Sequence, residues 1–204
     1  MAQVDLDSLS DLQYDVLREI GNIGSGNATT ALATMLNIRM DMSVPNVALL
    51  SFNEISGMIG SEEEQVVGIL LGLDSDIDGM MLFIFDMISA RKLVDRLMMV
   101  DSGDQITFNE IELSALSEIG NIVAGSYLTA LSTLTNLTIT STVPSMTIDM
   151  IGALLSIPAI EYGKFGDKIL LIQSHFGDDQ ITGYFLLVPE VESYGKILSS
   201  LGVV

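Results

Sequence analysis

Residues 17–45 have the sequence LREIGNIGSGNATTALATMLNIRMDMSVP, and residues 116–144 have the sequence LSEIGNIVAGSYLTALSTLTNLTITSTVP. The two stretches are 99 residues apart, align without a gap and are identical at 14 of 29 positions, which is far above chance. A second match, with an offset of 104, pairs residues 78–93 with residues 182–197. Two copies in the same order predict a pseudo-twofold molecule, because a solenoid needs three or more short repeats.

The length and composition are those of a folded chain with a real core. The chain has 204 residues, of which 49% are apolar and 17% charged, and such a composition excludes a disordered polymer. On the usual scale of roughly 150 residues per domain, one domain or two small related lobes fit the length. We expect a single domain over residues 1–204, with internal repeats at about 8–100 and 107–204.

Each repeat is expected to begin with a long amphipathic helix, because apolar residues recur there at helical spacing. Capping-box patterns mark the starts of these helices. The candidate capping pairs are Ser8 with Asp11, Ser10 with Gln13, and Thr107 with Glu110. We expect the helices to run to about Asn37 and Asn136, each followed by a strand-like segment that ends in Val-Pro.

The rest of each repeat predicts two strands and a closing helix. Short apolar runs bounded by Asp and Gly are typical of buried strands; these runs are residues 65–73, 79–85, 168–174 and 183–188. Closing helices are expected over residues 89–99 and 193–201. The connections between paired strands are too short for a crossover helix, which favours antiparallel pairing. The expected fold class is α/β of the α+β type, with two long helices packed on a mostly antiparallel sheet.

Charge and residue types exclude several classes of function. Eight Lys and Arg against 27 Asp and Glu give a net charge of −19, which repels nucleic acids and anionic membrane surfaces. The chain has no Cys and only His175 as histidine, so thiolate nucleophiles, disulfides and multi-histidine metal sites are excluded. Residues 1–10 show no secretory signal, and no apolar run is long enough for a membrane span. We expect a cytoplasmic protein that binds neither nucleic acid nor membrane.

Polar residues share one face of each long helix. Their spacing of four, three and four residues places them in one stripe; the two sets are Asp15, Glu19, Asn22, Gly26 and Ser114, Glu118, Asn121, Gly125. These residues have two possible roles. In a purely structural role, the glutamates are ordinary solvated residues and the asparagines cap or bridge helices. Asn and Gly both lower helix propensity, yet both repeats contain them, which favours a functional face. The glycines of residues 21–26 are expected to allow close packing between the two long helices.

A carboxylate and an amide three residues apart can bind a partner and orient a reactant, but they cannot supply an activated nucleophile. The carboxylate can pair with a cation on a partner, and the amide can hold a water molecule with one donor and one acceptor. Phosphoryl transfer needs little beyond positioning and charge stabilisation, and an amide can orient the attacking water. The ExxN face is therefore suited to assist catalysis in the active site of another protein.

The duplicated segment EIGNI, at residues 19–23 and 118–122, resembles the paired signature of the CheC-type chemotaxis phosphatases, the CheC/CheX/FliY superfamily. The resemblance covers nearly the whole chain. Two intact motifs in one chain resemble the CheC branch and differ from CheX, a one-motif protein that dimerises, so we expect a monomer.

The resemblance implies that this chain dephosphorylates the response regulator CheY. It assigns Asn22 and Asn121 the role of orienting the attacking water at the acyl phosphate. It assigns Glu19 and Glu118 the pairing with a CheY lysine. Asp15 and Ser114 are the matching first positions of the motif and tentative partner contacts. Magnesium belongs to CheY in this family, so no cofactor is expected in this chain.

The family resemblance also implies a second partner, the receptor deamidase CheD. Asp149 interrupts an apolar segment, and its counterpart in the first repeat is Leu50. One interpretation is that residues 145–157 form an exposed helix that docks the deamidase; the other is that Asp149 caps a local turn. The alternatives to a phosphatase are an adaptor that binds and inhibits CheD without catalysis, and a structural component of the flagellar switch.

Overall fold

The computed structural model describes residues 9–36, 42–103, 105–162, 168–176 and 181–203. The elements of the first half are α1 (Asp11–Leu36), β1 (Met42–Ser51), α2 (Phe52–Ile59), β2 (Gln65–Ser75), β3 (Gly79–Asp86) and α3 (Met87–Met98). Those of the second half are α4 (Glu110–Thr135), β4 (Ile139–Ser141), β5 (Ser145–Met150), α5 (Ile151–Tyr162), β6 (Lys168–Phe176), β7 (Ile181–Pro189) and α6 (Val191–Ser200). The two halves run through nearly the same order of elements, as the sequence repeat predicts.

The strands form one antiparallel sheet in the order β1-β6-β7-β3-β2-β4, with β5 also paired to β2. Antiparallel pairing was expected, but the exchange of strands between the halves was not. The strands that follow the long helices pair with the other half: β1 pairs with β6, and β4 and β5 both pair with β2. At the centre of the sheet, β3 pairs with β7 so that Leu82 lies opposite Leu186, its own equivalent at the offset of 104. The local pseudo-twofold axis therefore passes through this pair.

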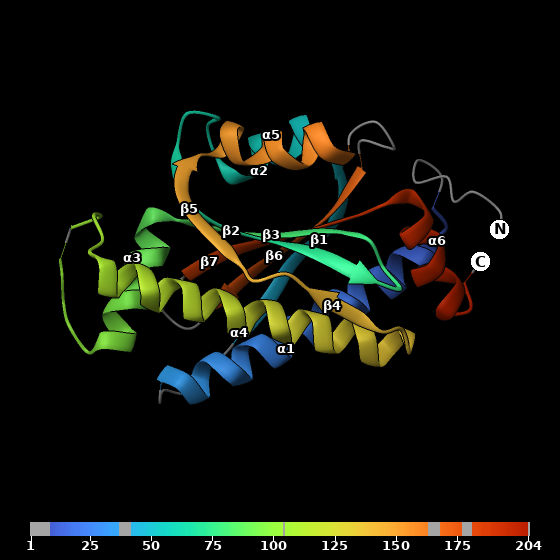
Figure 1. Ribbon diagram of the computed structural model, residues 1–204, viewed down its shortest axis with the longest axis horizontal. Helices are drawn as coiled ribbons and strands as arrows, with labels where there is room; N and C mark the ends of the chain where they lie inside the picture. The colour runs from blue at the N-terminus through green and yellow to red at the C-terminus, as the bar shows by residue number, and fades with distance from the viewer. Residues whose placement is uncertain (1–8, 37–41, 104, 163–167, 177–180, 204) are drawn as a thin grey trace.

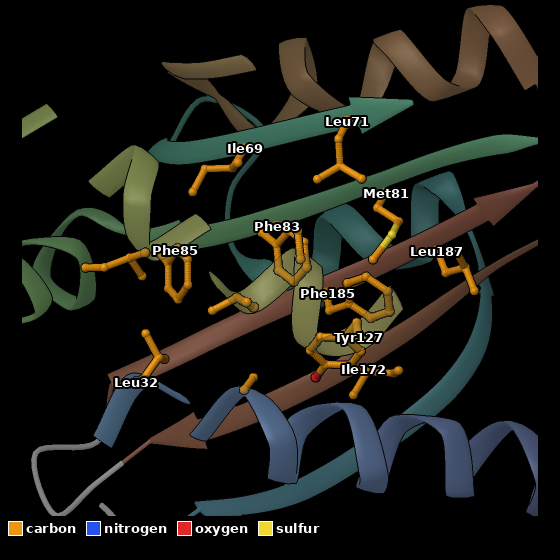
Figure 2. Close-up of a cluster of buried hydrophobic side chains, with 14 of the residues drawn as sticks. Leu32, Ile69, Leu71, Met81, Phe83, Phe85, Tyr127, Ile172, Phe185 and Leu187 are labelled. Carbon is orange, nitrogen blue, oxygen red and sulfur yellow. The ribbon is translucent and has the colours of Figure 1, made fainter. Parts of the chain in front are cut away.

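Helices cover both faces of the sheet (Figure 1). The long helices α1 and α4 lie side by side on one face, and α2 and α5 lie on the other. The larger apolar core lies under the long helices, and Figure 2 shows its centre, where the rings of Phe83, Tyr127 and Phe185 gather. Tyr127 and Phe185 stack with their ring centroids 4.1 Å apart. This aromatic cluster belongs to α4, β3 and β7, so it joins the two halves.

Capping residues fix where the long helices begin. For α1, Ser10 and Gln13 form the predicted pair, and the Ser10 backbone N–H donates to the Gln13 side-chain oxygen at 2.8 Å. For α4 the prediction of Thr107 with Glu110 is wrong. Asn109 caps this helix by accepting from the backbone N–H of Glu112 at 3.1 Å, while the Glu112 carboxylate accepts from the Asn109 N–H at 2.8 Å.

Ser8 and Asn37, which the sequence analysis placed at the ends of α1, lie outside the described residues.

Glycines bring the long helices close to the sheet. A β-carbon at Gly21 would lie 3.1 Å from Ile172 Cδ1, and one at Gly120 would lie 2.5 Å from Ile69 Cδ1. Ile172 and Ile69 occupy matching places in β6 and β2, so each helix rests on a strand of the other half. The expectation that glycines bring the two helices together holds only for Gly24, where a β-carbon would collide with the Tyr127 ring of α4.

Candidate active site

The long helices separate a buried face from an exposed polar face. On α1 the side facing the sheet carries buried residues such as Leu17, Ile20 and Leu32. Because the polar set is offset from these positions around the helix, its members are exposed. Asp15, Glu19 and Asn22 are exposed on α1, and Ser114, Glu118 and Asn121 are exposed on α4. The structure therefore groups the residues of each predicted site on one outer helix face.

The two motifs lie at opposite ends of the helix pair, because α1 and α4 run antiparallel (Figure 1). Gly24 of α1 faces Tyr127 of α4 near the middle of both helices. Met35, at the end of α1, lines the same hollow as Glu110 and Ser114, at the start of α4. The structure thus presents two separate faces, each made mainly by one helix.

Each motif borders its own shallow hollow, and the two hollows differ in chemistry. The first, of about 410 Å³, contains Asn22 but not Glu19, and its lining includes the charged side chains Asp11, Asp15 and Arg18. Arg18 lies 3.9 Å from Asp15, and both side chains are largely exposed. The electrostatic contribution of such a pair is small in water.

The second hollow, of about 700 Å³, contains both motif residues, Glu118 and Asn121. Its other walls are largely apolar, with Leu97 of α3 and Ile111 of α4 among them. The Asn121 amide nitrogen lies 3.5 Å from a Glu118 carboxylate oxygen, a long and weak hydrogen bond. Both side chains are therefore free to turn towards an incoming ligand.

A buried ion-pair network anchors the start of α4 beneath the second motif. Arg91 of α3 donates to the Glu112 carboxylate at 2.6 Å and to the Asp95 carboxylate at 2.9 Å. Its guanidinium also lies 4.9 Å from the centre of the Phe108 ring. This network joins α3 and α4, the helices whose side chains form the apolar wall of the second hollow.

The network shifts the titration of its carboxylates. The hydrogen bond from Arg91 lowers the pKa of Glu112, and the capping bond from Asn109 adds to this. Burial alone would raise the pKa of Asp95, but hydrogen bonds from Ser102 and the charge of Arg91 lower it overall. The network was not predicted from the sequence, although the spacing of Asn109 and Glu112 is itself a capping-box pattern.

Three buried hydroxyl groups meet beneath the crossing of the long helices. The Tyr127 and Ser25 hydroxyl groups share a hydrogen bond, and the Ser25 hydroxyl lies 3.0 Å from the Ser174 hydroxyl. Burial raises the pKa of Tyr127. These buried groups satisfy one another, and Figure 2 shows Tyr127 within the apolar core, so they do not reach the outer face of the site.

Asp149 lies away from both motif faces, and the expected helix over residues 145–157 is wrong at its start. Residues Ser145–Met150 form β5, which pairs with β2 and places Asp149 opposite Val66. The helix begins only at Ile151. Asp149 is exposed and accepts a hydrogen bond from the Met150 N–H at 2.8 Å. The matching strand β1 pairs in the same way with β6.

Within the described part of the chain, no three or more His, Cys, Asp or Glu side chains cluster as metal ligands would. No helix in the same ranges combines the length and apolar character needed to cross a membrane.

The fold and the duplicated outer face define a class of pseudo-symmetric α+β proteins. The fold resembles that of Thermotoga maritima FliY, with a TM-score of 0.75 and 21% identity over 95% of this chain and 98% of that one. It also resembles a chain in the CheX–CheY–BeF3–Mg²⁺ complex from Borrelia burgdorferi, with a TM-score of 0.53 and 17% identity, covering 85% of this chain and 97% of that one.

Sequence comparison narrows this class to one family. The CheC-like family matches twice, at residues 12–49 and 111–148, and so at the offset of 99. The CheY-P phosphatase CheC of Bacillus subtilis is 34% identical over 200 residues, which cover 95% of this chain and 96% of that protein. The flagellar motor switch phosphatase FliY of the same organism is 32% identical over 130 residues, or 63% of this chain and 34% of FliY. The chain belongs to the CheC-like family.

Proposed function

We propose that this protein is a phosphatase that accelerates the dephosphorylation of the phosphorylated response regulator CheY. The observation that carries the proposal is the pair of exposed Glu and Asn residues on each long helix, at opposite ends of the helix pair. The family membership supports it, because the B. subtilis relative with matching length is a CheY-P phosphatase.

In the proposed reaction, the protein orients the attacking water and contributes a negative charge that binds the partner. The bond that breaks is the aspartyl-phosphate bond of the response regulator. The Asn22 or Asn121 amide orients a water molecule towards the phosphorus of the aspartyl phosphate. The Glu19 or Glu118 carboxylate pairs with a lysine of the partner and fixes the approach of the helix. An amide can do this because it both donates to and accepts from one water molecule, and positioning of this kind is a large part of phosphoryl-transfer catalysis.

The magnesium ion of the reaction belongs to the response regulator in this proposal, and the protein has no cofactor of its own. Two sites in one chain also allow the protein to act as a monomer. Sedimentation in the presence and absence of the phosphorylated partner tests this, because a stable dimer of the free chain would contradict it.

Release of phosphate from phosphorylated CheY, with and without this protein, tests the function directly. We expect acceleration by the unaltered chain and near loss of it in the double variant Asn22→Ala, Asn121→Ala. The melting temperature of the variant should be unchanged, because both side chains are exposed and surface changes rarely exceed about 0.5 kcal/mol. A double variant with full activity would show that the amides do not orient the water.

We propose CheD as a second partner, with binding through the exposed edge strand that contains Asp149. Within the described residues, β5 pairs on one side only, and an unpaired edge with an acidic side chain can accept a partner. Asp149→Lys should weaken this complex and leave phosphate release from CheY unchanged, while Asp74→Lys, at the exposed end of β2, serves as the control. Unchanged affinity for the deamidase would exclude Asp149 from that interface.

A further inference from the structure

The outer stripe of each long helix contains two residues that the proposed chemistry does not use. The first is a large apolar residue seven positions before the glutamate, Leu12 on α1 and Ile111 on α4. Leu12 is 60% exposed and Ile111 is 70% exposed. The second is a glycine four positions after the asparagine, Gly26 or Gly125. All of these positions fall within one helix stripe with the ExxN residues.

The apolar residue is not among the described side chains that pack against the apolar core. Leu12 and Ile111 occupy equivalent positions at the offset of 99. Among the exposed large apolar side chains of the described residues, no other such pair is exposed in both halves. Ile111 also lines the second hollow together with Glu118 and Asn121. Burial of such a side chain in an interface is strongly favourable, so its presence beside both motifs indicates a contact made only in a complex.

The glycine is equally unexplained by the fold. A β-carbon at Gly26 or at Gly125 would meet nothing within 4 Å, and neither residue has a positive φ. Each carbonyl accepts a hydrogen bond from a threonine hydroxyl four residues later, Thr30 at 2.9 Å and Thr129 at 2.7 Å, and this bond does not require glycine. Glycine inside a helix is less stable than alanine. Both halves therefore keep a residue that weakens the helix locally and that the packing of the fold does not require.

We infer that the phosphorylated response regulator covers the whole stripe from the apolar residue to the glycine. Leu12 or Ile111 is the apolar anchor at one end of this footprint. Gly26 or Gly125 is the point at the other end where the partner approaches the helix backbone. The two positions are 14 residues apart in the sequence, which is about 21 Å along the helix, and the ExxN residues lie between them. This inference rests on the proposed function, because the occupant is the substrate of the same sites.

The occupant follows from the position and the duplication of the stripe. The apolar residue lies in the same stripe as the Glu and Asn. The partner that contacts the Glu and Asn, the phosphorylated response regulator, is therefore also the partner that covers the apolar residue. The other helix layer, α2 and α5, lies on the opposite face of the sheet (Figure 1), so it does not contribute to this footprint. Because each stripe lies on its own helix, each holds its own partner molecule.

Single-site backgrounds test the footprint. Asn22→Ala leaves only the second site, and in this background Ile111→Ser and Gly125→Ala are compared for phosphate release from phosphorylated CheY. Ile111→Ser should raise KM about tenfold, the loss expected when an apolar anchor is removed, with kcat within about twofold because the amide and carboxylate are untouched. Gly125→Ala should also raise KM, while its melting temperature stays the same or rises, because alanine is the better helix former.

Two controls make the result decisive. Ile160→Ser changes an apolar residue on α5 that is 72% exposed, and its KM should not change. Ile111→Ser in the Asn121→Ala background, where only the first site is intact, should leave KM unchanged as well. An unchanged KM for both Ile111→Ser and Gly125→Ala in the Asn22→Ala background would overturn the footprint, although the proposed function would stand. If the unaltered chain fails to accelerate phosphate release, the proposed function itself fails.

Discussion

At the scale of single residues, the exposed glutamates determine binding more than stability. Glu19 and Glu118 lie on open helix faces and belong to none of the described ion pairs. Their proposed partner is a lysine of the response regulator. An interaction between exposed charges of this kind is screened by salt and affects association more than the fold.

Replacement of both glutamates tests this role. Glu19→Gln with Glu118→Gln should weaken binding of the phosphorylated regulator and flatten the dependence of the affinity on salt concentration. The melting temperature should stay close to that of the unaltered protein, since substitutions at such surface positions cost at most about 0.5 kcal/mol. Titrations at low and high salt measure the effect. A fall in melting temperature large enough to explain the lost activity would identify the glutamates as structural residues.

At the scale of elements, the start of α4 depends on a charge network that α1 lacks. Glu112 pairs with Arg91 and caps its own helix. The residue in the matching position of α1 is the neutral Gln13, whose amide donates to the Val203 carbonyl at 3.1 Å. The two motif helices are therefore anchored by different interactions, and only the anchor of α4 titrates.

The pH dependence of stability follows from the lowered pKa of Glu112. A group whose pKa is lowered by folding stabilises the protein above its unfolded pKa, about 4.3 for glutamate. This contribution is lost as the pH falls through the lower folded value. Glu112→Gln should therefore be less stable than the unaltered protein at pH 7, and the difference should shrink below about pH 4. Urea unfolding over this range measures it.

The exposed neighbour Glu110 provides the control for this experiment. It has no described hydrogen bond to a side chain, so Glu110→Gln should change stability less at every pH. A difference between Glu112→Gln and the unaltered protein that stays constant from pH 7 to pH 3 would show that the ion pair does not contribute.

At the scale of the whole molecule, the antiparallel arrangement of α1 and α4 separates the two sites. Each motif borders its own hollow, and no described residue lines both hollows. Distant sites without shared partners behave additively. We therefore expect the two sites to work independently.

Single asparagine variants measure this independence. Asn22→Ala and Asn121→Ala should each remove the contribution of one site, with a loss per site of about 10²-fold, as for other single groups that position a transition state. The residual activity of the two single variants should sum to that of the unaltered protein. A single variant that abolishes all activity would show that the sites are coupled through the interlocked sheet.

Features that depend on local pattern could be predicted from the sequence alone. The repeat at an offset of 99, the long helices, the paired strands and the polar stripe follow from helical and strand periodicity, since the side-chain direction is set by spacing along one element. The stripe around Glu19 and Asn22 could be drawn before any fold was known. The same holds for its copy around Glu118 and Asn121.

Which elements pack against one another becomes clear only in the folded chain. The exchange of β1 and β5 between the halves depends on contacts far apart in the chain, and local patterns carry no information about such pairing. For the same reason Asp149 was expected in a helix but lies in β5, where pairing with β2 overrides local preference. The Arg91 network and the open space at Gly26 and Gly125 are likewise properties of packing. They emerge only when α3, α4 and the sheet are placed together.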